Sequence, residues 1–163
     1  QIYLESELFN NGVRPAINPG FSVSRVGGAA QIEAMRKIAG PLRIELAQYR
    51  ELAAFAQFGS DLNPDTQERL NQGERIMEIL KQPQYKPMPV KKQVLILYVL
   101  VNKYLLDVEL ARVREFQRKF LAYVDEKYND ILDEIRETGK ISGELEEKIK
   151  AVITEFKKQQ GFG

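Results

Sequence analysis

The sequence contains no cysteine and no histidine. Disulfides, thiol nucleophiles, zinc sites and imidazole acid–base chemistry are therefore excluded within this chain. The lack of cysteine also fits a reducing compartment. Long hydrophobic runs are missing as well, because the longest, Val94–Val101, has eight residues, whereas a membrane-spanning helix needs about 20.

An excess of charge of one sign is also absent, since 24 basic side chains are balanced by 23 acidic ones and the net charge is +1. Such a chain offers no bulk field for nucleic acid or an anionic membrane, so we expect no nucleic-acid partner. What remains is ordinary for a globular domain: 163 residues, of which 44% are hydrophobic and 29% charged.

The first residues are patterned for a β-strand. Ile2 and Leu4 alternate with polar residues over Gln1–Glu5, as in a strand with one buried face. Nearly everything after Gly28 is patterned for helix, so this strand finds no partner. We infer a fragment of a longer protein, whose sheet comes from residues upstream.

From Ala29 onward the sequence predicts a succession of helices. Gly40-Pro41 is expected to end one helix and start another, which continues to about Phe58. Asn63-Pro64 is an N-cap and first-turn pair for the next helix, and Gly73 is expected to break that helix.

The second half begins with a loop, because Gln82–Pro89 carries three prolines. Val90–Asn102 is β-prone in composition, but its length favours a central buried helix. A long helical pattern follows from about Glu109 to Glu137, with Asn129 as a candidate break. Gly139 and Ser142 then serve as a C-cap and an N-cap. The buried stripe of the last helix is predicted to be Leu145, Ile149, Val152 and Phe156, and the tyrosines and phenylalanines in general are interpreted as packing residues.

The most informative segment is Arg14–Gly27, which reads R-P-A-I-N-P-G-F-S-V-S-R-V-G. A proline turn, glycine bends and a β-prone run that ends in Arg25 would present a guanidinium on a rigid loop. Such a group can stabilise the negative charge of a phosphoryl-transfer transition state. Taken alone, however, one arginine is no motif, and a surface arginine in a structural salt bridge is the simpler interpretation.

Three further strings change that interpretation: E-L-A-Q-Y-R-E-L-A-A-F-A-Q-F-G-S-D-L at Glu45–Leu62, L-K-Q-P-Q-Y-K-P-M at Leu80–Met88 and T-G-K-I-S at Thr138–Ser142. With Arg14–Gly27, and in this order, they resemble the C-terminal third of the alpha subunit of the rotary proton-translocating (F-type) ATP synthase. The phosphate-binding loop of that family lies upstream, and no G-x-x-x-x-G-K-[ST] occurs in this sequence. We therefore expect no ATP hydrolysis by this chain alone.

The resemblance implies a mainly α fold in two parts. Residues 1–28 would be the end of an α/β nucleotide-binding domain, with its last strand and an arginine-finger loop, and residues 29–163 an all-helical bundle domain. In that family the S-V-S-R arginine reaches into the ATP site of the neighbouring beta subunit. The resemblance therefore makes Arg25 the catalytic residue of this chain.

The resemblance also implies a base pocket for the subunit's own regulatory nucleotide. An amide offers both a donor and an acceptor to the edge of an adenine, and Gln82 and Gln84 match the family's K-Q-x-Q-Y glutamines. Phe9, Arg14 and Pro15 match residues that line the same pocket. Pro83 departs from the family, where many members have a small residue, and would stiffen the loop. Without the resemblance, the two glutamines are ordinary loop residues.

The implied cofactor is ATP or ADP with Mg²⁺, whose phosphate and metal contacts lie outside this chain, so no metal ligand is assigned. The implied partners are beta subunits in an alternating hexamer, the central gamma shaft and the peripheral stalk. Phe58–Asn63 is expected to face the shaft through packing, because Asp61 is its only charge. Membrane contact is expected only through the complex, on the cytoplasmic face of a bacterial membrane, with mitochondrial and thylakoid membranes left open.

Two alternatives stay open at this stage. One is a non-enzymatic helical interaction domain, which leaves the R-P-A-I-N and S-V-S-R strings unexplained. The other is an alpha-like subunit of a related sodium-driven or flagellar-type rotary ATPase. A phosphate-binding loop upstream of Arg25 would favour the ATP synthase.

Overall fold

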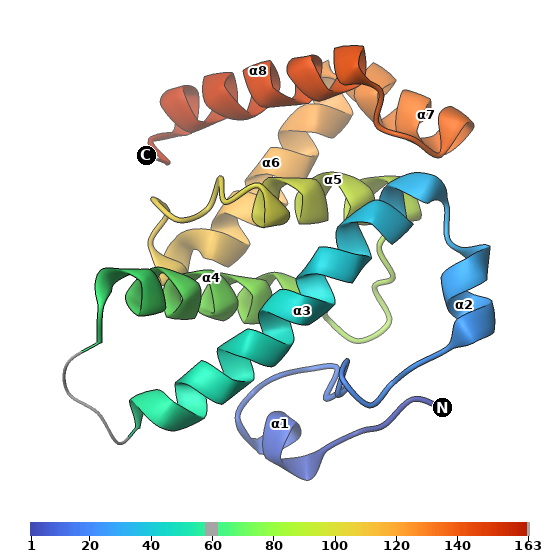
Figure 1. Cartoon of the computed structure of the whole chain (residues 1–163). Helices are drawn as coiled ribbons and strands as arrows, with labels where there is room; N and C mark the ends of the chain where they lie inside the picture. Colours follow the sequence, from blue (N-terminus) through green and yellow to red (C-terminus); the bar gives the residue numbers. More distant parts are fainter. Residues whose placement is uncertain (58–61, 163) are drawn as a thin grey trace.

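The computed structural model describes residues 1–57 and 62–162. Within these ranges the chain is mainly α, as predicted (Figure 1). Its elements are α1 (Ser6–Asn10), α2 (Arg25–Ala30), α3 (Glu33–Ala56), α4 (Pro64–Leu80), α5 (Val90–Val101), the 3₁₀ helix η1 (Leu110–Arg112), α6 (Val113–Lys127), α7 (Asn129–Thr138) and α8 (Gly143–Gln160). Across the described parts of the chain, no helix combines the length and the apolar character needed to cross a bilayer.

Helix α5 is the centre of the core. Every side chain from Val94 to Leu100 is buried, and the helix contacts α3, α4, α6 and α7. Covered on all sides, it needs no polar face, which explains its continuous apolar sequence. The predicted central buried helix is therefore confirmed.

Helix α3 is continuous through Pro41, so the predicted boundary at Gly40-Pro41 is wrong. Ala34, Ile38, Leu42 and Leu46 are buried on one face at four-residue intervals, and this stripe passes across the proline without a change of phase. Gly40 has no Cβ to clash with the proline ring. The carbonyl of Lys37, which loses its usual donor to the proline, belongs to an exposed residue. Packing against the core thus overrides the local break signal.

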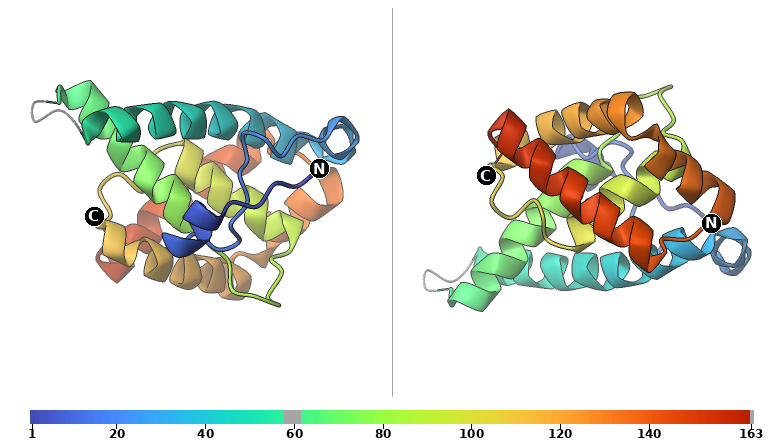
Figure 2. Two further views of the ribbon diagram at one scale, coloured as in Figure 1. Left: turned by 90° about the horizontal axis from the view of Figure 1, so that it is seen from below. Right: turned by 90° about the horizontal axis from the view of Figure 1, so that it is seen from above.

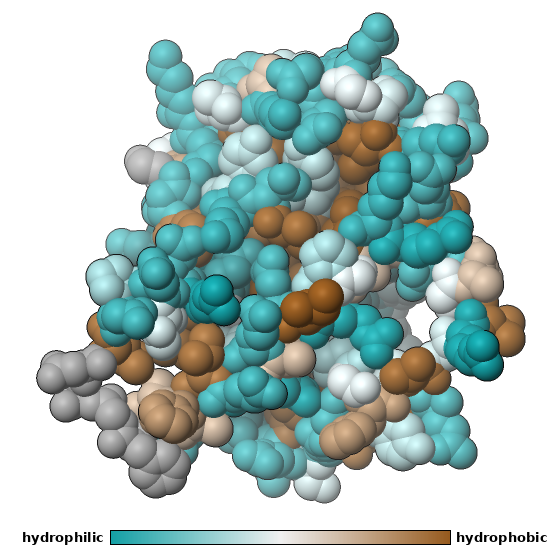
Figure 3. Space-filling model, in the orientation of Figure 1, coloured by the Kyte–Doolittle hydropathy of each residue, from teal (hydrophilic) through white to brown (hydrophobic). Residues whose placement is uncertain are grey.

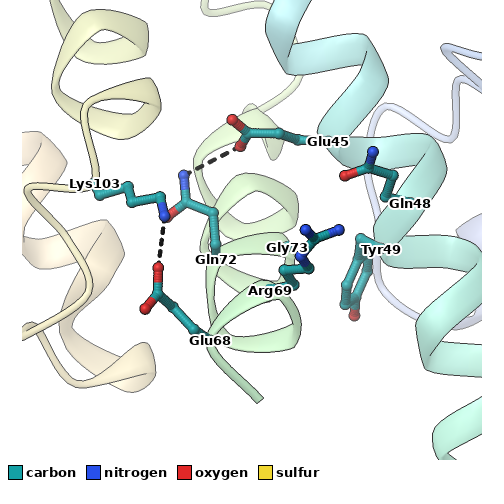
Figure 4. Close-up of a pocket in the computed structure, with 8 residues that line it drawn as sticks. All are labelled: Glu45, Gln48, Tyr49, Glu68, Arg69, Gln72, Gly73 and Lys103. Atoms are coloured by element: carbon teal, nitrogen blue, oxygen red, sulfur yellow. Dashed lines mark hydrogen bonds and ion pairs between the residues drawn. The ribbon is translucent and has the colours of Figure 1, made fainter. Parts of the chain in front are cut away.

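Helix α4 is likewise continuous through Gly73, so the predicted break there is also wrong. A Cβ built on Gly73 would lie 2.1 Å from Cδ2 of Tyr49, on α3. Tyr49 of α3 and Gly73 of α4 both line a pocket of about 200 Å³ between the two helices (Figure 4). Gly73 is therefore a site of close helix–helix approach.

The C-terminal helices begin and end close to the predicted residues. The long pattern breaks at Tyr128, between α6 and α7, one residue before the candidate break. Gly139 ends α7 in the left-handed conformation, and the hydroxyl of Ser142 accepts a hydrogen bond from the Leu145 amide at the start of α8. All four predicted stripe residues of α8 are buried.

A buried arginine fixes the turn that follows α5. Arg75 of α4 is 8% exposed, and its guanidinium donates to the carbonyl oxygens of Leu105 (2.6 Å), Leu106 (3.2 Å) and Val108 (2.7 Å). These carbonyls lie in a turn, where only that of Leu105 also accepts a backbone bond, from the Val108 amide at 3.0 Å. The arginine therefore supplies donors to turn carbonyls that would be costly to bury unsatisfied.

The N-terminal segment differs from its prediction. Gln1–Glu5 does not form a strand; it forms one antiparallel bridge, between Leu4 and Ile17. The side chains of Ile2 and Leu4 are 74% and 71% exposed. The alternating pattern is present, but within the described residues nothing covers its apolar side, so the pattern alone does not produce a strand.

Among the described residues, most of the large exposed hydrophobic side chains lie between residues 2 and 26: Ile2, Tyr3, Leu4, Phe9, Phe21, Val23 and Val26. In the rest of the described chain such residues occur singly. The face in Figure 3 is largely hydrophilic with scattered hydrophobic patches. Residues 2–26 therefore carry the main apolar surface that the described chain leaves uncovered.

Candidate functional site

Asn18 organises the segment that carries Arg14 and Pro15. It is 2% exposed, and its Oδ1 accepts hydrogen bonds from the amides of Gly20 (2.9 Å) and Phe21 (3.3 Å). Its Nδ2 donates to the Glu5 carboxylate. Asn18 was not among the predicted site residues, although an asparagine before Pro-Gly is a recognised turn signal.

The structure joins three of the predicted base-pocket residues directly. The guanidinium carbon of Arg14 lies 4.1 Å from the centre of the Phe9 ring, and the backbone amide of Gln82 donates to the Arg14 carbonyl oxygen at 2.9 Å. Figure 2, left, shows α1 and the loop after α4 on the same side of the molecule. Segments about 70 residues apart in sequence are therefore in direct contact.

A hollow of about 400 Å³ lies beside this junction, lined by Pro15, Gln82, Pro83, Gln84, Tyr85, Lys86 and Pro87. We call it the loop hollow. Both glutamines are exposed, and no side-chain hydrogen bond to either amide occurs among residues 1–57 and 62–162. Their donors and acceptors are thus open to a ligand. Phe9 and Arg14 do not line the hollow, and they adjoin it through Pro15 and the Gln82 amide.

Tyr85 corrects the prediction that the aromatic residues serve packing. Its side chain is 90% exposed at the loop hollow, and its backbone has φ 59°, in the left-handed region that side chains other than glycine rarely adopt. The string L-K-Q-P-Q-Y-K-P-M contained the signal, since a tyrosine between two prolines has no helical stripe to join.

Arg25 is placed differently from the β-prone run predicted for it. It is the first residue of α2, whose N-cap is Ser24, with the Ser24 hydroxyl accepting from the Gly27 amide at 2.9 Å. The Arg25 side chain is exposed, and within the described ranges its guanidinium has no ion pair or hydrogen bond. Helix α2 stands at the edge of the molecule (Figures 1 and 2). The structure does not bring Arg25 into the loop hollow.

Two further expectations concern metal and shaft contacts. In the described parts of the chain, no group of three or more acidic, histidine or cysteine side chains is arranged to hold a metal ion. The donor set at the loop hollow, two amides and a phenol, suits a base edge and does not fit Mg²⁺. Residues 58–61 of the turn expected to face the shaft lie outside the described residues.

Comparison with known proteins gives a match to the family "ATP synthase alpha/beta chain, C terminal domain" over residues 31–156. The chain is 58% identical to "ATP synthase subunit alpha" of Caldanaerobacter subterraneus subsp. tengcongensis over 159 residues, 98% of the chain. It is 58% identical to the protein of that name from Clostridium kluyveri over 97% of the chain, and 55% identical to that from Clostridium botulinum over 96%. The chain spans 31% of the length of each of these relatives.

Proposed function

Because the chain belongs to the ATP synthase alpha/beta C-terminal domain family, we propose that it is the C-terminal part of a regulatory, non-catalytic alpha subunit of the proton-translocating ATP synthase. The observation that carries the proposal is the identity of 55–58% with proteins named subunit alpha over 96–98% of the chain. The apolar surface of residues 2–26 is then the surface that upstream residues of the same subunit cover.

The loop hollow would receive the adenine of the subunit's own ATP or ADP. Gln82 and Gln84 present donors and acceptors to the base edge, and Tyr85 offers an exposed ring beside them. Arg14 and Phe9 hold Pro15 against the loop through the Gln82 amide. As the resemblance implies, the contacts to the nucleotide's phosphates and to Mg²⁺ would come from upstream residues of the subunit, since the two amides and the phenol at the loop hollow do not fit Mg²⁺.

Arg25 would act on a different nucleotide, at the catalytic site of the neighbouring beta subunit. Its exposure at the start of α2 and the absence of an in-chain partner among the described residues leave the planar guanidinium free to bind γ-phosphate oxygens. Such an arginine finger stabilises the charge of the transition state and is worth about 10³–10⁵ in rate.

The proposed setting is the catalytic head of the complex. Alpha and beta subunits would alternate around the gamma shaft, with a peripheral stalk holding the ring, and the head would make ATP from ADP and phosphate as protons cross the membrane. Relatives from bacteria favour the cytoplasmic face of a bacterial cell membrane, with the chain reaching the membrane only through the complex.

The replacement Arg25→Lys in the assembled complex tests the arginine finger. Lysine keeps the charge but loses the planar fork, so we expect multisite ATP hydrolysis to fall by about 10³-fold or more. Nucleotide bound at alpha's own site should be retained, as measured by release and chromatography of tightly bound nucleotide.

Arg43→Lys is the matched control, because Arg43 is also an exposed arginine, on α3. It should leave turnover unchanged. Turnover of the Arg25→Lys complex within a few-fold of the unmodified complex would rule out the finger role.

A further inference from the structure

A second hollow adjoins the loop hollow and lies between the loop after α4 and helix α6. Its volume is about 520 Å³, and its lining residues are Lys81, Gln82, Pro83, Lys86, Met88, Arg114, Glu115, Gln117, Arg118 and Leu121. We call it the basic groove. In Figure 2, left, the loop that follows α4 runs beside α6. None of the contacts proposed above for the nucleotide or for Arg25 uses the α6 side of this groove.

The groove keeps an excess of positive charge after its ion pairs are formed. Lys81 pairs with Glu78. The one lining carboxylate, Glu115, lies 2.7 Å from Lys119 and 3.4 Å from Arg112. By contrast, the lining cations Lys86, Arg114 and Arg118 have no ion pair among the described residues.

The positions of Arg114 and Arg118 do not stabilise helix α6. Arg114 and Arg118 are one turn apart on α6, so their like charges face each other on the same side of the helix. Arg114 also lies in the first turn of α6, where the helix dipole is positive and a cation is unfavourable. A bound anion would reverse both effects.

The floor of the groove is apolar. Leu121 is 7% exposed and Met88 packs against the core, and Pro83 lies on the loop side. Two guanidinium forks and an ammonium over an apolar floor suit phosphoryl oxygens, which arginine binds in bidentate fashion. The volume is also within the range of small-ligand sites.

We propose that the basic groove is a binding site for a phosphate-bearing ligand, either a small oligophosphate or the headgroup of an anionic phospholipid. Arg114, Arg118 and Lys86 bind the phosphoryl oxygens, and Leu121 and Met88 contact the remainder of the ligand. The site is separate from the arginine finger, and it adjoins the base pocket, with which it shares the lining residues Gln82, Pro83 and Lys86.

The test titrates inorganic pyrophosphate into the 163-residue chain and measures binding by calorimetry and by shifts of backbone amide resonances. We expect shifts at residues 81–88 and 114–121. The double variant Arg114→Gln/Arg118→Gln should bind at least about tenfold more weakly. A matched double variant, Arg43→Gln/Lys158→Gln, removes two exposed cations on α3 and α8 and should bind as the unmodified chain does. Circular dichroism establishes that both variants are folded.

Co-sedimentation with vesicles distinguishes the two sources of phosphate. A lipid headgroup is the ligand if the chain binds vesicles that contain phosphatidic acid but not vesicles of pure phosphatidylcholine. This binding must also be lost in the Arg114/Arg118 double variant. Binding of pyrophosphate alone identifies a soluble ligand. Equal weakening in both double variants, or no binding of either probe, overturns the proposal. Binding of poly-glutamate through these arginines without binding of pyrophosphate also overturns it, and would indicate an acidic protein partner.

Discussion

At the scale of single residues, glycine has two different roles in the helices of this chain. Gly139 and Gly161 end helices in the left-handed conformation, which is the role that local sequence rules anticipate. Gly73 has helical neighbours on both sides and is needed because Tyr49 of α3 occupies the space of a side chain. A sequence rule cannot separate the two cases, since the second depends on a residue 24 positions away.

The replacement Gly73→Ala tests this role. A Cβ there would lie 2.1 Å from the Tyr49 ring, so α3 and α4 would have to move apart. We expect the free energy of unfolding to fall by about 1–3 kcal/mol, as is typical of overpacking. Urea unfolding followed by circular dichroism measures it.

Gly143→Ala is the matched control, because a Cβ at Gly143 meets no atom within 4 Å. We expect it to be neutral or to stabilise the chain by up to about 1 kcal/mol, through the unfolded state. If Gly73→Ala behaved in the same way, the close approach of the two helices would be contradicted.

Among the helices, α8 is joined to α6 and to the α6–α7 junction through one carboxylate, that of Glu155. Glu155 of α8 accepts hydrogen bonds from the hydroxyls of Tyr128 (2.7 Å) and Tyr123 (2.9 Å). These two bonds, that of Tyr128 first, lower the pKa of Glu155 below 4.5. Burial, reinforced by the bond to Glu155, raises the pKa of Tyr123 above 10.

The two shifts predict loss of stability at both ends of the pH range. A lowered carboxyl pKa contributes stability that is present above pH 4.5 and is lost as the pH falls through the folded-state pKa. A raised phenol pKa contributes stability that is present below pH 10 and is lost as the pH rises towards the folded-state pKa. We therefore expect Glu155→Gln to flatten the decline of stability below pH 4.5, as measured by thermal unfolding.

Glu126→Gln provides the control for this experiment. Glu126 is exposed on α6, and its replacement removes the same charge without touching either tyrosine. The acid limb of its stability curve should match that of the unmodified chain. Equal flattening in both variants would mean that net charge, and not the tyrosine contacts, governs the acid limb.

At the scale of the whole molecule, the candidate base pocket depends on contacts between distant segments. Residues 14–15 and 82–87 meet through the bond from the Gln82 amide to the Arg14 carbonyl, while Arg25 stands apart on α2. One chain would thus serve two nucleotides, its own at the loop hollow and the neighbour's at Arg25. The two functions should be separable by mutation.

The replacement Gln82→Ala/Gln84→Ala in the assembled complex tests this separation. Loss of both amides should weaken nucleotide retention at alpha's own site by about tenfold or more, since hydrogen bonds to the base edge are lost. Catalytic turnover should change far less than in the Arg25→Lys complex. Gln160→Ala, at an exposed glutamine of α8, should leave retention unchanged. If the Gln82→Ala/Gln84→Ala complex retained its nucleotide fully, the two glutamines would have no role in binding the base.

Some of the candidate site residues could be predicted from the sequence, and others could not. Arg14, Pro15, Gln82 and Gln84 lie in two of the strings that resemble the family, and Phe9 was matched to the same pocket; the structure places all five around one junction. Their roles remain predictions. Asn18 and Tyr85 were missed, because a buried asparagine and an exposed tyrosine are defined by their surroundings and not by spacing.

Local patterns were enough to predict the mainly α fold, the burial of α5, the caps at Gly139 and Ser142 and the stripe of α8, because helix length, periodicity and caps depend on residues within a few turns of one another. Three features depend instead on distant segments and could not be predicted locally: α3 passes through Pro41, α4 passes through Gly73, and Gln1–Glu5 forms a single bridge. In α3 and α4 the free energy of packing against a distant segment exceeds the local preference of one proline or one glycine. The alternating pattern of Gln1–Glu5 meets no covering surface among the described residues, so its local preference alone does not produce a strand.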